Sequence, residues 1–223
     1  MNRLFDIAGG VLIGFLISFF VISSYKNDYI AVKDSDSKPW FEIPKSVADK
    51  LSAQYVSIDT DGYTGSGCQI KPGFYLTSLH VIANAILDES LISVNDQKAQ
   101  VVWKSKTDED YVILTTWAEF DKRKLDFPPF NNFADNINII LVGSPGDQQK
   151  LVQPGKILRS AQDDNKKIKE YAKVISAQYV DYGLSGGCVY SEDGETLLGV
   201  LTSKYQSPGS TIGEVTIVNR PIE

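Results

Sequence analysis

Two side chains that could share one reaction lie far apart in this chain. His80, within "TSLHVI" (77–82), is the only histidine among 223 residues. Ser185 lies within "GLSGGCVY" (183–190), where the surrounding glycines predict a tight turn that exposes the hydroxyl. An imidazole can accept the proton of a serine hydroxyl and so activate its oxygen as a nucleophile. These two residues therefore indicate acyl-transfer chemistry, which also needs an acid to orient the histidine.

The order of these residues along the chain restricts the kinds of serine enzyme that could use them. In an α/β-hydrolase the histidine follows the serine, but no histidine lies beyond Ser185. The subtilisin order requires an aspartate ahead of His80 and an α/β scaffold, whereas this chain has the pattern of a β protein throughout. The order that remains is histidine, aspartate, serine.

The stretch "DEDYVILTT" (108–116) supplies an acid between the two residues. Asp110 directly precedes an apolar strand, so its carboxylate can turn inward, while Glu109 stays in the solvated turn. Asp110 lies 30 residues after the histidine and 75 residues before the serine. Asp108 is the alternative acid. We expect the histidine and the acid on one half of the folded body and the serine on the other.

Short β-strands must position these residues. Runs of β-branched and aromatic residues alternate with Gly, Pro, Asn and Asp, which is typical of an all-β barrel or sandwich. The charged, proline-rich stretch 119–136 divides the runs into two sets and is interpreted as a surface linker. One or two helical turns are expected within 81–87. The expected strands are 54–58, 67–70, 74–78, 91–94, 99–104, 111–116, 137–143, 156–160, 171–180, 187–191, 197–203 and 214–218.

Taken in order, these motifs resemble the trypsin-like serine peptidases of the chymotrypsin fold, particularly their bacterial HtrA-like branch. The matching stretches are "GSGCQI" (65–70) before "FYLTSLHVI" (74–82), "DEDYVIL" (108–114), "VGSPG" (142–146), and "GLSGGCVY" followed by "LLGVLTS" (197–203). The resemblance covers roughly residues 50 to 220. It implies two six-stranded antiparallel β-barrels within a peptidase domain over 46–223. The N-terminal barrel would span about 46–120 and the C-terminal barrel about 136–223.

The resemblance also implies a role for each site residue. His80 would act as general base and then general acid, Asp110 would fix its tautomer, and Ser185 would attack the scissile carbonyl of a peptide. The backbone N–H groups of Gly183 and Ser185 would form the oxyanion hole. Segment 202–205 would pair with an extended substrate. No cofactor is implied. The residues expected to contact substrate are Tyr179, Tyr182, Thr202, Ser203 and Lys204.

Three features depart from the trypsin-like pattern. Leu184 precedes the nucleophile where trypsins have an aspartate that pairs with a new N-terminus, so activation by N-terminal insertion is not expected. Tyr179 lies six residues before Ser185, where an aspartate would select Arg or Lys. The chain ends shortly after its last expected strand, so the PDZ domain of many HtrA-like enzymes is not expected.

The two cysteines are 120 residues apart, at Cys68 and Cys188. Without a C-x-x-C pair or further histidines they cannot form a metal site. From the residues alone, they could pair in an oxidising compartment or remain as inert core thiols. The resemblance places their segments together behind the active site, and so implies a Cys68–Cys188 disulfide between the barrels. Its formation would support a folded body outside the cytoplasm.

An uncharged apolar run at 7–25 precedes the folded body. As a helix rising about 1.5 Å per residue, these 19 residues would roughly span the core of a bilayer. We predict a transmembrane signal anchor over 1–25 and a juxtamembrane linker over 26–45. The peptidase domain would then be periplasmic or extracellular. A signal peptide cleaved near Ser23 or Ser24 is the alternative.

The apolar run and the overall charge also bear on partners. Gly10, Gly14 and Ser18 have a small-xxx-small spacing that could pack two such helices, which leaves a homo-oligomer open. The net charge of −6 opposes nucleic-acid binding, which requires clustered Lys and Arg. The remaining hypotheses are a membrane-anchored serine endopeptidase, an esterase using the same triad, and a peptidase-like module that binds peptides without turnover. The complete set of site residues favours an enzyme.

Overall fold

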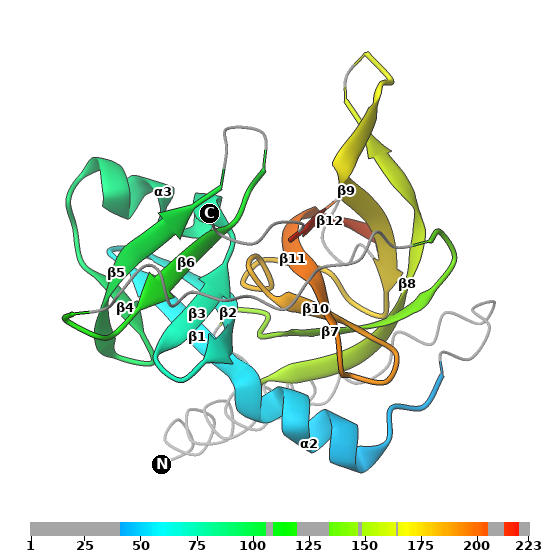
Figure 1. Ribbon diagram of the computed structural model, residues 1–223, viewed down its shortest axis with the longest axis horizontal. Helices are drawn as coiled ribbons and strands as arrows, with labels where there is room; N and C mark the ends of the chain where they lie inside the picture. Colours follow the sequence, from blue (N-terminus) through cyan, green and yellow to red (C-terminus); the bar gives the residue numbers. More distant parts are fainter. Residues whose placement is uncertain are drawn as a thin grey trace, which may run out of the picture. The chain divides into compact units, whose positions relative to one another are not determined.

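The computed structural model describes residues 41–105, 109–119, 134–146, 149–163, 165–204 and 212–218. This part of the chain forms two closed antiparallel β-barrels of six strands each (Figure 1). The predicted two-barrel, all-β fold is therefore confirmed. The apolar run 7–25 and Asp108 lie outside the described residues. So do most of the expected juxtamembrane linker, 26–45, and most of the expected surface linker, 119–136. Within the described ranges, no helix is long and apolar enough to cross a membrane.

Short hairpins build the first barrel, in the strand order β1-β2-β3-β6-β5-β4. The β4–β5 hairpin turns through Asn95 and Asp96, which both have positive φ angles of 47° and 65°. Two such central residues match the right-handed twist of the flanking strands. Helix α3 (Leu79–Leu87) follows β3. The strands are β1 (Tyr55–Thr60), β2 (Tyr63–Lys71), β3 (Phe74–Thr77), β4 (Ile92–Val94), β5 (Gln97–Lys104) and β6 (Val112–Thr115).

The second barrel has the strand order β10-β11-β12-β9-β8-β7. Its interior is filled by apolar side chains from alternate strand positions, including the fully buried Ile139, Leu141 and Ile175. The β8–β9 hairpin is the longest and extends well beyond the barrel (Figure 1). The strands are β7 (Asn138–Gly143), β8 (Leu151–Gln162), β9 (Ile168–Ala177), β10 (Cys188–Ser191), β11 (Leu197–Lys204) and β12 (Ile212–Ile217).

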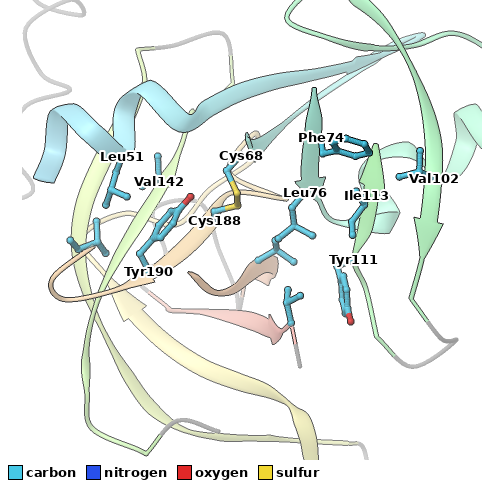
Figure 2. Close-up of a cluster of buried hydrophobic side chains, with 13 residues drawn as sticks. Leu51, Cys68, Phe74, Leu76, Val102, Tyr111, Ile113, Val142, Cys188 and Tyr190 are labelled. Carbon is cyan, nitrogen blue, oxygen red and sulfur yellow. A yellow bond between two sulfur atoms is a disulfide. The ribbon is translucent and has the colours of Figure 1, made fainter. Parts of the chain in front are cut away.

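A shared apolar core and one covalent bond join the two barrels. Cys68 of β2 and Cys188 of β10 form a disulfide with a Cα–Cα distance of 6.0 Å, as the resemblance implied. Figure 2 shows this bond among side chains of both barrels, with Leu76 from the first and Tyr190 from the second. Both sulfur-bearing residues are fully buried. The two barrels are therefore joined covalently through a buried interface.

The sequence did not predict helix α2 (Lys45–Gln54), which precedes β1. Pro44 lies just ahead of its first turn, a position that proline tolerates because its missing N–H would have no helical partner. Leu51 is the only residue of the helix that is buried, and it joins the interface core. The helix also contacts the β10–β11 turn, where Lys50 Nζ lies 2.9 Å from a carboxylate oxygen of Glu195. α2 therefore attaches the start of the folded body to the second barrel.

Candidate active site

His80 and Asp110 are brought together at the edge of the first barrel. His80 lies in the first turn of α3, directly after β3, and Asp110 lies just before β6. These segments are neighbours because β3 and β6 pair, with Thr77 opposite Val112. The Asp110 carboxylate accepts the backbone N–H of His80 at 2.9 Å, and its other oxygen lies 2.5 Å from the ring Nδ1. With its proton on Nδ1, the neutral imidazole presents a lone pair at Nε2.

Both partners of this pair remain accessible to solvent. The side chain of His80 is 37% exposed and that of Asp110 is 32% exposed. A substrate can therefore reach the imidazole, while the carboxylate, held by two hydrogen bonds, keeps the ring in one orientation. This arrangement suits a general base whose tautomer is fixed by an acid.

Two consecutive β-turns, 181–184 and 184–187, present Ser185, which is the second residue of the latter. The N–H of Leu184 donates to the Asp181 carbonyl at 3.2 Å, and the N–H of Gly187 donates to the Leu184 carbonyl at 2.8 Å. The third residues of these turns are Gly183 and Gly186, whose φ angles are +87° and +82°. A type II turn requires a positive φ at this position, which explains the glycines on both sides of the serine.

The turn that carries Ser185 packs directly against the segments that lead to His80. The Ser185 carbonyl accepts the N–H of Ser66 on β2 at 2.8 Å. A Cβ atom at Gly186 would lie 2.1 Å from Oγ1 of Thr77, three residues before the histidine. The Leu201 carbonyl accepts both the Gly186 N–H and the Ser78 hydroxyl. The structure thus gathers the three predicted residues at one junction between the barrels.

Two peptide groups in this turn have fixed orientations. The carbonyl of Tyr182 accepts the Gly146 N–H at 3.0 Å, and the carbonyl of Leu184 accepts the Gly187 N–H. In a trans peptide the N–H points opposite to the carbonyl, so the amides of Gly183 and Ser185 are also fixed. Neither amide has a hydrogen-bond acceptor among the residues that the structure describes.

Tyr179, at the expected pocket base, is held by other protein groups. Its backbone N–H and carbonyl bond the side-chain amide of Gln153 at 2.8 and 2.6 Å. Its hydroxyl donates to a carboxylate oxygen of Asp181 at 2.9 Å. The structure thus places the Asp181 carboxylate against this phenol. Tyr182, the residue directly before Gly183, is 71% exposed at the surface of the turn.

The remaining predicted contact residues lie along β11. Thr202 donates its hydroxyl to the Glu214 carbonyl of β12 at 3.2 Å, and the backbone of Ser203 and Lys204 pairs with the same strand. β10 pairs with β11 only as far as Val200. Within the described ranges, segment 202–204 therefore has β12 on one edge and no strand on the other.

Ser66, within "GSGCQI" (65–70), is a residue for which the sequence predicted no role. The structure places this fully buried serine between the two barrels, where its hydroxyl donates to the Gly183 carbonyl at 2.6 Å. No signal in the sequence indicates this contact, because the two residues are 117 positions apart.

In the described part of the chain, no cluster of three or more His, Cys, Asp or Glu side chains could hold a metal ion.

Comparison with solved structures establishes the fold independently. No protein-family model matches the sequence, and no curated protein is similar to it in sequence. The inactive form of the Rv3671c protease from M. tuberculosis has a TM-score of 0.59 at 21% identity, over 79% of this chain and 89% of that chain. The HtrA-type protease AlgW with tripeptide has a TM-score of 0.58 at 18% identity, over 77% of this chain and 58% of that chain.

A third similar structure is the serine endoprotease from Yersinia pestis, with a TM-score of 0.53 at 21% identity, over 79% of this chain and 64% of that chain. All three proteins are described as proteases. The similarity shows that this chain has the two-barrel fold of trypsin-like and HtrA-type serine proteases.

Proposed function

We propose that this protein is a serine endopeptidase that uses His80, Asp110 and Ser185 as its catalytic residues. The observation that carries the proposal is the 2.5 Å contact between His80 Nδ1 and the Asp110 carboxylate. The turn that carries Ser185 packs against Thr77, three residues before this histidine. The protease fold and the two amides without acceptors support the same conclusion.

In the proposed mechanism, the Ser185 Oγ attacks the scissile carbonyl of a peptide while His80 Nε2 takes its proton. Asp110 stabilises the resulting imidazolium and keeps its orientation. The N–H groups of Gly183 and Ser185 donate to the negatively charged oxygen of the tetrahedral intermediate. The intermediate then expels the amine, which takes a proton from His80. Water attacks the acyl-enzyme by the same route, releases the acid product and restores the serine.

The substrate is an extended peptide that lies along the open edge of β11. Main-chain groups of 202–204 would pair with it as an added strand, next to the exposed ring of Tyr182. Tyr179 occupies the base of the pocket for the residue before the cleaved bond. Because Asp181 already accepts the Tyr179 hydroxyl, we propose that the pocket selects apolar side chains in preference to Arg or Lys.

Labelling with a fluorophosphonate, followed by digestion of a peptide library, tests this proposal on the full-length protein. Wild type should be labelled at Ser185, and neither Ser185→Ala nor His80→Ala should be labelled. Asp110→Asn should lower kcat by about 10⁴-fold, because the imidazole would then hold the wrong tautomer. Asp61→Asn, on the exposed β1–β2 turn, is the matched control and should keep wild-type activity.

Two outcomes would contradict the proposed activity in different ways. Wild-type protein that resists labelling would favour a peptide-binding module without turnover. Wild-type protein that is labelled and hydrolyses activated esters, yet cleaves no peptide in the library, would favour an esterase.

We also propose that residues 7–25 anchor the protein in a membrane, with the folded body over 46–223 outside the cytoplasm. The Cys68–Cys188 disulfide supports an oxidising compartment. The protein should stay with the membrane during carbonate extraction. Protease added to cells with a permeabilised outer envelope and an intact cytoplasmic membrane should digest its folded body. A body that stays protected by the cytoplasmic membrane would contradict this location. Light scattering of the detergent-solubilised protein would measure whether the anchors form a homo-oligomer.

A further inference from the structure

We propose that Ser66 is a positioning residue for the oxyanion hole. Its hydrogen bonds orient the peptide groups on both sides of Gly183. This inference rests on the proposed peptidase function. Ser66 lies on β2 of the first barrel, whereas the groups it orients belong to the second. It would therefore couple the two barrels at the place where charge develops during the reaction.

Ser66 uses all of its polar groups in hydrogen bonds, although it is fully buried. Its hydroxyl donates to the Gly183 carbonyl at 2.6 Å and accepts the Ser144 N–H at 2.9 Å. Its N–H donates to the Ser185 carbonyl at 2.8 Å, and its carbonyl accepts the Thr77 hydroxyl at 2.7 Å. Ser66 thus bonds the carbonyls of both Gly183 and Ser185, the two residues whose amides would form the oxyanion hole.

The two bonds of the hydroxyl act on the two peptide groups that flank Gly183, one directly and one through the Ser144 loop. The Ser66 hydroxyl fixes the Gly183 carbonyl, and so limits rotation about the glycine. Through Ser144 it also holds the short loop whose Gly146 N–H fixes the Tyr182 carbonyl. Tyr182 and Gly183 share the peptide whose N–H would donate to the oxyanion.

Glycine has more conformational freedom than any other residue, so these restraints matter at position 183. Removal of the Ser66 hydroxyl would leave the buried Gly183 carbonyl without its donor, which is unfavourable away from solvent. Rotation about Gly183 would let this carbonyl regain a partner. The same change would reorient the adjoining Tyr182–Gly183 peptide and turn the Gly183 N–H away from the substrate. Ground-state binding along β11 would be unaffected, because no substrate-pairing group of β11 bonds Ser66.

Thr115 provides a closely matched control. It is equally buried, and its hydroxyl also donates to a backbone carbonyl, that of Gly73 at 2.7 Å, and accepts a backbone N–H, that of Trp117 at 3.2 Å. It lies on β6 of the same barrel, at the opposite end of the strand from Asp110. Thr115→Val therefore removes a comparable buried hydroxyl without touching the site.

The experiment compares Ser66→Ala with Thr115→Val in the full-length protein. Active sites are titrated with the fluorophosphonate, so that kcat is expressed per folded site. We expect kcat of Ser66→Ala to fall about 10- to 100-fold with KM changed less than about 3-fold, somewhat less than the loss of a whole oxyanion-hole donor. A peptide aldehyde, which forms an oxyanion with Ser185, should lose affinity by the same factor as kcat. Thr115→Val should keep kcat within about 2-fold.

Each result bears on the inference separately from the proposed function. If wild type hydrolyses peptides but Ser66→Ala keeps kcat within about 2-fold, or raises only KM, the positioning role of Ser66 is wrong and the peptidase function stands. If wild type has no activity, both are wrong. Should Ser66→Ala not fold, Ser66→Cys replaces it, because a thiol is a weaker donor of similar shape. Unchanged kcat and aldehyde affinity in that variant would also overturn the role.

Discussion

At the residue scale, Gly183 combines a positive φ with a very close approach of another backbone segment. A Cβ atom at this position would lie 2.0 Å from the Gly146 nitrogen and 2.8 Å from the Ser144 carbonyl oxygen. Backbone atoms cannot move aside as a flexible side chain can. Any residue other than glycine must therefore displace the turn that presents Ser185.

We predict that Gly183→Ala lowers kcat/KM by at least about 100- to 1000-fold, the effect of losing one oxyanion-hole donor. Gly62→Ala is the matched control, because Gly62 also has a positive φ, +82°, but no neighbouring atom of the described residues lies within 4 Å of a Cβ built there. That variant should lose about 1–2 kcal/mol of stability through backbone strain and keep its activity. Equal activities of the two variants, measured with a cleaved peptide, would contradict the assignment of the Gly183 amide.

The sequence indicated which residues should meet, but not all of the groups that hold them. With only one histidine, the order of residues selected Asp110 and Ser185, and the structure brings them to the junction of the barrels. Their catalytic roles stay a prediction. The contacts of Ser66 and the Tyr179–Asp181 pair could not be inferred, because they depend on how two barrels and two turns pack in three dimensions.

At the element scale, strands could be predicted where apolar and polar residues alternate clearly along the sequence. They were predicted too short where a proline interrupts that alternation. The prediction for β8 covered only 156–160, whereas the strand begins at Leu151 and includes Pro154. Pro154 is tolerated because β9 begins to pair with β8 only at Gly155, so the missing N–H costs no ladder bond on that side. Helix α2 escaped prediction because a single buried side chain leaves almost no periodic pattern.

We predict that this single side chain accounts for most of the attachment of α2. Leu51 is fully buried, and Leu51→Ala should lower the free energy of unfolding by about 2–5 kcal/mol, through lost burial and a residual cavity. Leu87, the last residue of α3, is 79% exposed, and Leu87→Ala should change stability by less than about 0.5 kcal/mol. Urea denaturation measures both. A loss in Leu51→Ala no larger than in Leu87→Ala would show that α2 is not anchored by this contact.

At the scale of the whole molecule, buried phenols make stability depend on alkaline pH. Burial raises the pKa of the Tyr190 hydroxyl in the interface core, and burial also raises that of Tyr55. In the unfolded chain a tyrosine loses its proton near pH 10, while the native protein still retains it. Unfolding therefore releases protons above about pH 10, and the free energy of unfolding falls as the pH rises. Below that pH this contribution to stability is complete.

We predict that Tyr190→Phe makes this decline less steep, because one proton fewer is released on unfolding. Urea denaturation between pH 8 and 11 would measure the slope of stability against pH for both proteins. Between pH 8 and 9 the difference in stability between wild type and variant should stay constant. Parallel curves up to pH 11 would show that Tyr190 does not contribute to the alkaline transition.

The position of the disulfide also determines what a cut in the chain would do. Cys68 lies before the stretch between the barrels and Cys188 lies after it. A protease that hydrolyses any one peptide bond between residues 120 and 133 would therefore yield two polypeptides that stay covalently joined. They would migrate as one species until a reductant separates them. The nicked molecule would still hold the histidine and the serine at the same junction, on two different chains.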